Sequence, residues 1–433
     1  MQATQTKTLD DQAISALPEI DSDGLIAKLD TAKRLIDTEW GTAGTEPKPR
    51  PVLSVVMPCL NEADTLAVCI RKAYEGLAKL PVPGEVIVAD NGSTDGSREI
   101  AIELGARLID VPQRGYGAAL MAGIASAHGE YCVMGDADDS YDFREIDRFY
   151  ESLLTGADLV QGCRLPSGGG QVLPGAMPWL HRWLGNPVLT FLAVHMFRAP
   201  VHDVYCGLRG FRKSWQQRLD QRCIGMEFAV EMIVKGTLFG TRISEVPICL
   251  YPDGRKSHPP HLRTFRDGWR TLRFFLLHSP RHTFLMPGGV FCGIGGMGFL
   301  AALSGLRIGG GELGAHSLLV AGLFLLIGVQ LMSCAVIAKV FASGAKLLPV
   351  HGRLERFLEF WNLERSLLTC ASMVAIGTGL IGMTAWRWVL EGFGPLPYAT
   401  TLQSVVPGVG LIALATQLAA TSFVVSVLRM ARI

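Results

Sequence analysis

Short apolar runs alternate with helical patterns along the first half of the chain. The apolar runs predict β-strands at 53–57, 85–90, 106–111, 131–136 and 158–163. The helical patterns lie near 62–79, 95–104, 115–128 and 144–155. Strands and helices that alternate at this spacing predict a doubly wound α/β sheet, whose ligands bind beyond the carboxyl ends of the strands. We therefore expect functional side chains at these ends.

Four long apolar runs occupy the C-terminal third. They predict membrane spans at about 283–303, 317–341, 366–386 and 405–428, each close to the roughly 20 residues with which a helix crosses a bilayer. Residues 283–433 contain only 9 Lys or Arg and 5 Asp or Glu. The sequence therefore predicts an integral membrane protein.

The formal net charge of +1 hides three regions of different charge. Residues 1–252 carry 24 basic and 32 acidic side chains, whereas residues 253–281 carry 7 basic and 2 acidic ones. Basic residues beside a first membrane span are attracted to anionic headgroups or phosphates, and nucleic acid is not expected as a partner. We divide the chain into a polar extension and linker (1–50), an α/β domain (51–252), a basic interfacial collar (253–282) and a transmembrane region (283–433).

Basic residues in the loops predict the orientation in the membrane. The two loops on one side contain Arg307 and Arg387 as their basic residues. The middle loop and the C-terminal tail, on the other side, contain Lys346, Arg353, Arg356, Arg365, Arg429 and Arg432. The positive-inside rule then places the α/β domain and both termini in the cytoplasm.

Two amphipathic stretches rich in Trp, Leu and Phe follow the sheet segments, at 178–197 and 265–281. Such helices lie in the plane of the membrane interface or pack on the α/β domain. For the second, its position beside a span favours the interface; for the first, both interpretations stay open. The ten Cys are scattered without zinc-site spacing, so we expect reduced, mostly buried thiols rather than a disulfide framework.

An acidic turn follows the fourth predicted strand, in the sequence MGDADDSYD at 134–142. Asp136, Asp138 and Asp139 offer hard carboxylate oxygens, which suit Mg²⁺ or Mn²⁺ that also binds substrate phosphates. The alternative is a solvated turn in which an Asp caps the next helix.

Two more strand ends carry acids. The sequence ADNGSTDGS at 89–97 contains Asp90, which can accept hydrogen bonds from a nucleotide, and Gly92, which permits close approach. The sequence PCLNEAD at 58–64 places Glu62 at a third end. Each segment also reads as a plain turn or helix start, but three acidic ends of one sheet favour a binding site.

These three segments, in this order, resemble the family 2 glycosyltransferases of GT-A fold. The four spans narrow the resemblance to polyprenyl-phosphate sugar synthases of the dolichol-phosphate mannose or glucose type. It covers residues 53 to about 252 in sequence, the membrane part only in architecture, and residues 1–50 not at all. It implies a GT-A catalytic domain and inverting transfer of a hexose from a nucleoside diphosphate sugar to dolichyl or undecaprenyl phosphate. A UDP-hexose is favoured as donor, with GDP-mannose possible.

The resemblance also implies roles for individual residues. Asp136 and Asp138 would bind Mg²⁺ or Mn²⁺, and the catalytic group would be Asp138, Arg164 and Arg209. The implied nucleotide-sugar site comprises Pro58, Asn61, Glu62, Asp90, Gly92, Ser93, Asp136 and Ala137. The implied acceptor-phosphate site comprises Arg164, Arg209, Arg255, Lys256 and Ser257. The last three stand in GRKSH at 254–258, where relatives have these residue types in another order. For Arg164 and Arg209, the alternative is that each arginine pairs with a surface acid.

Two other functions compete with this one. A processive polysaccharide synthase of the same fold typically carries a Gln-x-x-Arg-Trp motif, which WQQRLD at 215–220 does not match. A non-catalytic nucleotide-binding membrane scaffold would need the acidic ends for structure alone. Glycines in the first and third spans permit close helix packing within the chain or in a homo-oligomer.

Overall fold

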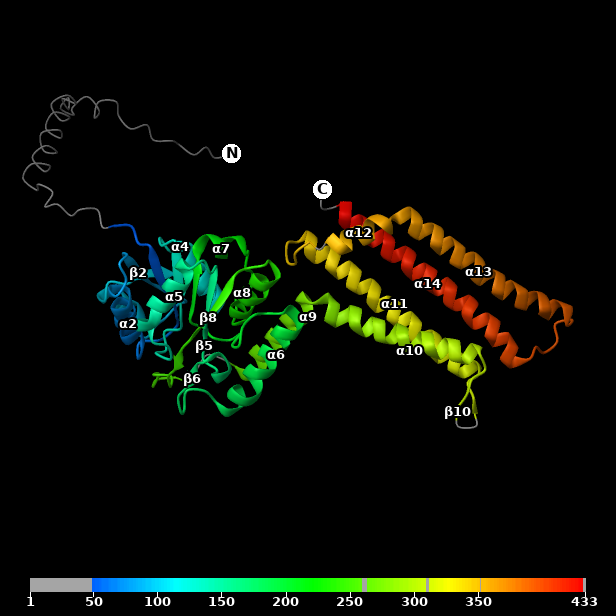
Figure 1. Cartoon of the computed structure of the whole chain (residues 1–433), viewed down its shortest axis with the longest axis horizontal. Helices are drawn as coiled ribbons and strands as arrows, with labels where there is room; N and C mark the ends of the chain where they lie inside the picture. The colour runs from blue at the N-terminus through cyan, green and yellow to red at the C-terminus, as the bar shows by residue number, and fades with distance from the viewer. Residues whose placement is uncertain (1–48, 259–262, 309–310, 351, 431–433) are drawn as a thin grey trace, which may run out of the picture. The chain divides into compact units, whose positions relative to one another are not determined.

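The computed structural model of the chain describes residues 49–433 except 259–262, 309–310, 351 and 431–433. The predicted extension at 1–50 therefore lies almost wholly outside the described residues. The α/β domain is built on a seven-stranded sheet in the order β3-β2-β1-β4-β7-β5-β8 (Figure 1). Its strands are β1 (Leu53–Cys59), β2 (Gly84–Asp90), β3 (Arg107–Asp110), β4 (Tyr131–Met134), β5 (Leu159–Cys163), β7 (Arg209–Arg212) and β8 (Ile243–Pro247).

Helices cover both faces of this sheet, as the predicted doubly wound architecture requires. On one face, α2 (Leu66–Ala78), α3 (Ser97–Glu103) and α5 (Ile146–Leu154) pack on side chains such as Val55. On the other, α4 (Tyr116–Ser126) and α8 (Glu227–Leu238) pack on side chains such as Val56. Consecutive strand residues are thus both fully buried, which explains why the strands read as continuous apolar runs.

One strand departs from the predicted pattern. β7 runs antiparallel to both of its neighbours, β4 and β5, and was not among the predicted strands. It begins with Arg209, which the resemblance implied only as a catalytic and acceptor-phosphate residue. Gly210, in its centre, has no side chain and leaves room for Phe149 and Leu153 of α5.

The strand register brings the acidic ends together. Cys59 at the end of β1 is paired with Asp90 at the end of β2. On the other side of β1, Val56 is paired with Met134, the last residue of β4. Because β1, β2 and β4 are parallel, the turns that follow them project from the same edge of the sheet.

Smaller elements complete the α/β domain and its connections. They are a helical turn at Phe143–Glu145, a turn at Pro166–Gly168, the pair β6 (Gln171–Val172) and β9 (Cys249–Leu250), and helix α7 (Lys213–Arg218).

All ten cysteines are unpaired, and six of them are buried.

Two amphipathic helices leave apolar side chains exposed. A π-helical turn (His181–Gly185) leads into α6 (Asn186–Phe197), and α9 (Thr264–His278) follows later in the chain. On α9, Phe274 and Phe275 are buried, whereas Phe265 and Trp269 are exposed on another side. The exposed residues of the earlier helix include Trp179, Trp183, Leu184, Val188 and Phe191. These surfaces have the composition of a membrane-interface helix.

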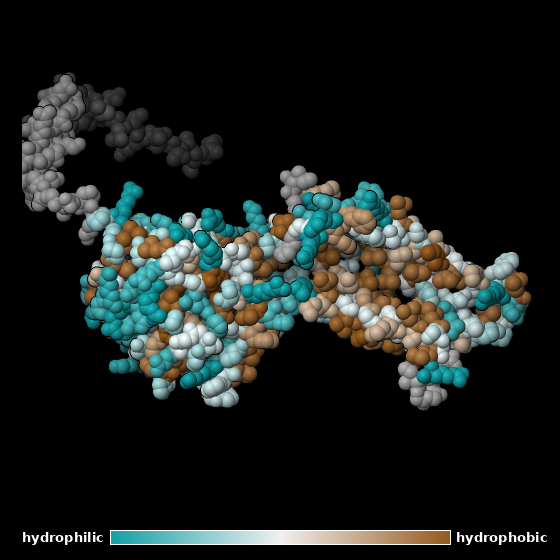
Figure 2. Space-filling model, viewed as in Figure 1, coloured by the Kyte–Doolittle hydropathy of each residue, from teal (hydrophilic) through white to brown (hydrophobic). Residues whose placement is uncertain are grey.

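Four helices are long and apolar enough to cross a membrane, within the described residues. They are Arg281–Leu303, which includes α10 (Met286–Leu303), α11 (Ala315–Gly344), α13 (Leu363–Leu390) and α14 (Tyr398–Met430). Each contains one predicted span. Figure 2 shows apolar surface along this part of the chain. A short hairpin of β10 (Arg307–Ile308) and β11 (Gly311–Glu312) joins α10 to α11, and α12 (Gly352–Phe360) precedes α13.

Candidate active site

The turn after β4 separates its three carboxylates. Asp136 Oδ1 accepts a hydrogen bond of 2.8 Å from the Tyr116 hydroxyl. Asp138 Oδ1 accepts from the hydroxyl of Ser140 at 2.5 Å and from its amide at 3.1 Å. Asp139, which has a positive φ of 63°, instead pairs with Lys72 at 2.7 Å. Asp136 and Asp138 are therefore the carboxylates of this turn that remain for a ligand.

Electrostatics sets Asp136 apart from the other acids. Its pKa is raised to about 7, first because the carboxyl is buried and second because the charge of Asp138 lies beside it. The hydrogen bond from Tyr116 and the charges of Arg255 and Arg164 oppose this rise. The charge of Asp138 disfavours ionisation of Asp136, and an added cation would offset this repulsion.

Arg255 joins the strand ends through three nitrogens. Its Nε lies 2.7 Å from Glu62 Oε2, its Nη2 lies 3.2 Å from Asp138 Oδ2, and its Nη1 lies 2.8 Å from Asp253 Oδ2. Only 9% of the Arg255 side chain is exposed. The guanidinium thus provides positive charge between Glu62, which follows β1, and Asp138, which follows β4.

The backbone around Arg255 is held to the same edge of the sheet. The amides of Lys256 and Ser257 both donate to Asp64 Oδ2, at 2.9 and 2.8 Å. The bond from the Lys256 amide, followed by those from the side chain and the amide of Ser257, lowers the pKa of Asp64 to about 2. The Gly254 amide donates to the carbonyl of Asp138 at 2.9 Å. Lys256 thereby anchors the segment through its amide, and Ser257 does so through its amide and its side chain.

The sequence around Asp90 allowed two interpretations, a binding segment and a plain turn, and the structure has features of both. Asp90 has no exposed surface; its carboxylate accepts from the amides of Gly92 and Ser93 and pairs with Arg98 at 2.7 Å. Gly92 has a φ of +91°, a conformation that favours glycine. The residue is thus an internal anchor of the turn, and the turn itself forms the edge of the site.

Hydrogen bonds tie this turn to the end of β1. The Asn61 amide donates to Ser93 Oγ at 2.8 Å, and Asn61 Oδ1 accepts from the Thr94 amide at 2.8 Å. Pro58 is paired with Ala89 in the strand register. On the turn after β4, Ala137 stands between the two aspartates, and its carbonyl accepts a hydrogen bond from the Thr65 hydroxyl at 2.6 Å. The structure therefore gathers the predicted nucleotide-sugar residues at one edge.

Arg164 lies at the end of β5 and is almost wholly buried. It donates to both carboxylate oxygens of Asp203, from Nε at 2.7 Å and from Nη2 at 2.9 Å. Its charge also contributes to the electrostatic environment of Asp136. Arg164 is thus positioned near the acidic turn by an acid that the sequence prediction did not include.

Arg209 does not lie where the sequence prediction requires it. The side chain has no exposed surface, and its guanidinium donates to the backbone carbonyls of Cys206, Val204 and Ala229. Contact with a phosphate would require these bonds to be exchanged. We therefore correct the prediction for Arg209 and interpret this residue as a structural support beneath the site.

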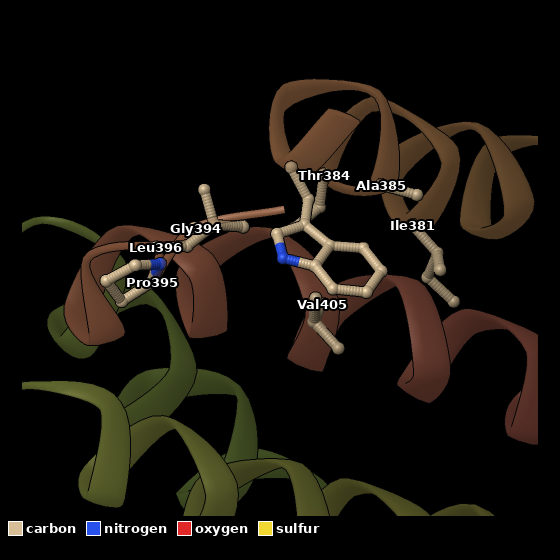
Figure 3. Close-up of a pocket in the computed structure, with 8 residues that line it drawn as sticks. Ile381, Thr384, Ala385, Gly394, Pro395, Leu396 and Val405 are labelled. Carbon is tan, nitrogen blue, oxygen red and sulfur yellow. The ribbon is translucent and has the colours of Figure 1, made fainter. Parts of the chain in front are cut away.

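A cleft of about 400 Å³ lies in the membrane helices, outside this group of residues. Figure 3 shows its lining, from the end of α13, the following loop and the start of α14. The lining residues are Ile381, Thr384, Ala385, Trp388, Gly394, Pro395, Leu396 and Val405. None of the predicted site residues is among them, and its mainly apolar surface does not suit a nucleotide.

Comparisons with known proteins show which family the chain resembles. The model of glycosyl transferase family 2 matches residues 54–219, and that of the glycosyltransferase family 2 C-terminal transmembrane region matches residues 336–429. The chain is 37% identical over 354 residues to the low-salt glycan biosynthesis hexosyltransferase Agl6 of Haloferax volcanii, covering 81% of this chain and 83% of that protein. The chain belongs to the family 2 glycosyltransferases.

Two further similarities concern this glycosyltransferase. It is 31% identical over 199 residues to the dolichyl-phosphate hexose transferase of Haloferax volcanii, covering 45% of this chain and 81% of that protein. A crystal structure of glucosyl-3-phosphoglycerate synthase from Mycobacterium tuberculosis with Mn²⁺ and UDP aligns with a TM-score of 0.39 and 21% identity. That alignment covers 53% of this chain and 78% of the other. The predicted GT-A fold and membrane glycosyltransferase class are confirmed.

The donor set of this glycosyltransferase fits a divalent cation that is bound together with a substrate. Within the described residues, no group of three or more His, Cys, Asp or Glu side chains has the arrangement of a metal site. Asp136 and Asp138 would supply two hard carboxylate ligands, and Mg²⁺ commonly takes one or two carboxylates with waters and substrate phosphates as its other ligands. The incomplete protein site is consistent with such an ion.

Four residues of the glycosyltransferase site were missed from the sequence: Asp64, Tyr116, Asp203 and Asp253. Each acts through a contact with a predicted residue or its segment. Asp203 stands near Arg209 in the sequence; the alternative considered for the arginines was a pairing with surface acids, whereas Asp203 is buried. For Tyr116, no local pattern indicates that its hydroxyl meets an acid 20 residues away.

Proposed function

We propose that this membrane glycosyltransferase transfers a hexose from a nucleoside diphosphate sugar to the phosphate of a polyprenyl lipid, with inversion at the anomeric carbon. The donor is a UDP-hexose in preference to GDP-mannose. The observation that carries the proposal is the proximity of Asp136 and Asp138 to the arginines at 164 and 255 in a domain followed by four membrane helices. The similarity to a dolichyl-phosphate hexose transferase supports the acceptor class.

The chemistry requires control of charge rather than a strong base. A phosphate monoester is already an anion near neutral pH and attacks the anomeric carbon directly, while the nucleoside diphosphate leaves. A divalent cation held by Asp136 and Asp138 would neutralise the leaving diphosphate as a Lewis acid. The turns at Asn61 and Gly92, the second of which is anchored by Asp90, would bind the nucleoside portion.

The arginines bring two anionic substrates together. Arg164, fixed by Asp203, and Arg255, fixed by Glu62, are held by carboxylates and present little surface. Planar guanidinium groups bind phosphate oxygens through directed hydrogen bonds. In this proposal they offset the repulsion between the acceptor phosphate and the donor diphosphate.

The membrane part fits a lipid acceptor. Basic residues of the collar follow the α/β domain, and exposed aromatic residues such as Trp269 lie on α9, just before the first membrane helix. We propose that this surface lies at the cytoplasmic interface, where the lipid phosphate meets the catalytic domain. The charge distribution of the loops supports the same orientation.

A matched pair of variants tests this function. Membranes that contain the full chain receive radiolabelled UDP-glucose or GDP-mannose, a polyprenyl phosphate and Mn²⁺. Label is expected to enter an organic-soluble, mild-acid-labile lipid, with UDP-glucose preferred. Asp138→Asn should reduce transfer at least a hundredfold, whereas Asp139→Asn, whose carboxylate pairs with Lys72, should retain most of it.

Several outcomes would contradict the proposal. Full transfer by Asp138→Asn, or by the wild type in excess chelator, would exclude the metal assignment. Label in a non-lipid polymer would instead indicate a processive synthase. Retention of the donor's anomeric configuration in the product, measured by NMR, would exclude inversion.

A further inference from the structure

Arg255 occupies the position in the carboxylate cluster where a metal ion is expected. In the described part of the chain, it is the cation that pairs with Asp138. The Asp138 carboxylate has one oxygen, Oδ1, engaged by Ser140, so the oxygen that remains for a metal is Oδ2. Oδ2 is the atom that Arg255 contacts.

The three contacts of Arg255 are unequal in length. Those to Glu62 and Asp253 are short, at 2.7 and 2.8 Å, whereas that to Asp138 is 3.2 Å. They use different nitrogens of the guanidinium, so the contact to Asp138 can break while the other two persist. The Asp138 contact is thus the one that is most easily exchanged.

We propose that Arg255 is the resident counter-ion of the metal site, and that Arg255 and the divalent cation compete for Oδ2 of Asp138. This inference rests on the proposed function in taking Asp138 as a metal ligand. On loading, Arg255 releases Asp138 and keeps Glu62 and Asp253. Its freed N–H groups then become available to a phosphate oxygen.

The competition follows from the charges at the site. Without a cation, the carboxylates of Glu62, Asp136 and Asp138 repel one another in a partly buried region, where charges interact more strongly than in water. With Arg255 in contact with Asp138 Oδ2, a metal ion at the same oxygen would place two cations side by side, and their repulsion opposes binding unless a diphosphate accompanies the ion. Arg255 therefore stabilises the site before loading and opposes binding of metal without nucleotide.

The test is a titration of the full chain in detergent with Mn²⁺ alone, followed by the electron paramagnetic resonance signal of free Mn²⁺. Arg255→Met removes the competing cation and is expected to lower the Kd for Mn²⁺ about tenfold. The matched control is Lys72→Met, which removes the same charge from the neighbouring carboxylate, Asp139. It should change the Kd by less than about threefold because this pair is more exposed.

Two further measurements keep the result interpretable. Arg255→Lys retains a cation and should bind Mn²⁺ nearly as the wild type does, which separates charge competition from damage to the fold. Saturating UDP should cancel or reverse the advantage of Arg255→Met, because this variant lacks the guanidinium that would bind a phosphate oxygen in the wild type.

Different results would overturn different claims. Equal Mn²⁺ affinity of the wild type and Arg255→Met, or an equal gain in Lys72→Met, would exclude the competition while leaving metal-dependent transfer intact. Undetectable Mn²⁺ binding in every protein, with transfer that persists in chelator, would exclude both the competition and the metal in the proposed function.

Discussion

Arg164 and Asp203 form a bidentate ion pair. Its two hydrogen bonds are short, 2.7 Å from Nε to Oδ2 and 2.9 Å from Nη2 to Oδ1. The Asp203 side chain has no exposed surface, and that of Arg164 is 10% exposed. Asp203 also accepts from the amides of Arg164 and Tyr205. The acid therefore fixes both the side chain and the backbone at the end of β5.

Asp203→Asn is expected to destabilise the α/β domain by about 3–5 kcal/mol, because it leaves the Arg164 charge buried without its partner. The measurement is the free energy of unfolding, or the apparent melting temperature in detergent. The matched control is Glu130→Gln, which breaks a pair with Arg212 whose acid is 63% exposed, and should have little effect. Equal losses in the two variants would contradict the structural role assigned to Asp203.

The same pair predicts a pH dependence of stability. Burial alone would raise the pKa of Asp203, but the charge and hydrogen bonds of Arg164 outweigh it and lower the pKa below its usual range. Because the folded-state pKa lies below the unfolded value of about 3.9, the contribution is complete above that pH and is lost as the pH falls further. The melting temperature of the wild type should decrease as the pH drops below about 4, and that of Asp203→Asn should decrease less steeply. Parallel curves from pH 6 to pH 3 would show that Asp203 contributes nothing to this loss.

Tyr116→Phe is expected to lower kcat/KM for the nucleotide sugar about tenfold with little change in stability. The lost hydroxyl donates to Asp136 Oδ1 at 2.8 Å, and a hydrogen bond to a charged group contributes roughly 1.5–3 kcal/mol. Steady-state transfer with varied donor concentration provides the measurement. Tyr74→Phe is the control, since the Tyr74 hydroxyl bonds to the Gly105 carbonyl on an exposed surface. Unchanged kinetics of Tyr116→Phe would remove the hydroxyl from the proposed site.

The layered architecture could be predicted because local patterns determine it. Strands buried on both faces, such as β1, are continuous apolar runs, and the acidic turns follow them directly in the sequence. The antiparallel β7 could not be predicted in this way, because it is short and has Arg209, Gly210 and Arg212 among its four residues. Its place depends on pairing with β4 and β5, which are distant in sequence.

For the candidate site, the acids at the strand ends could be predicted, whereas the contacts of the arginines could not. Asp90, Asp136 and Asp138 stand at strand ends, where chain order alone places them at one edge. The arginines were harder, since their roles depend on long-range partners: Arg164 on Asp203, and Arg255 on Glu62. The sequence pattern of Arg209 does not reveal that backbone carbonyls surround its guanidinium.

Glycines of the third span provide a test of the membrane region. A methyl group at Gly377 would lie 2.6 Å from the Gly408 carbonyl oxygen, whereas one at Gly379 would meet nothing within 4 Å in the described structure. Gly377→Ala should therefore force α13 and α14 apart and destabilise their packing by about 1–3 kcal/mol. Gly379→Ala, two residues away on the same helix, should be neutral. The apparent melting temperature in detergent compares the two variants, and a cysteine pair across α13 and α14 reports their separation. If Gly379→Ala were the more disruptive change, the face of α13 that packs on α14 would have to be reassigned.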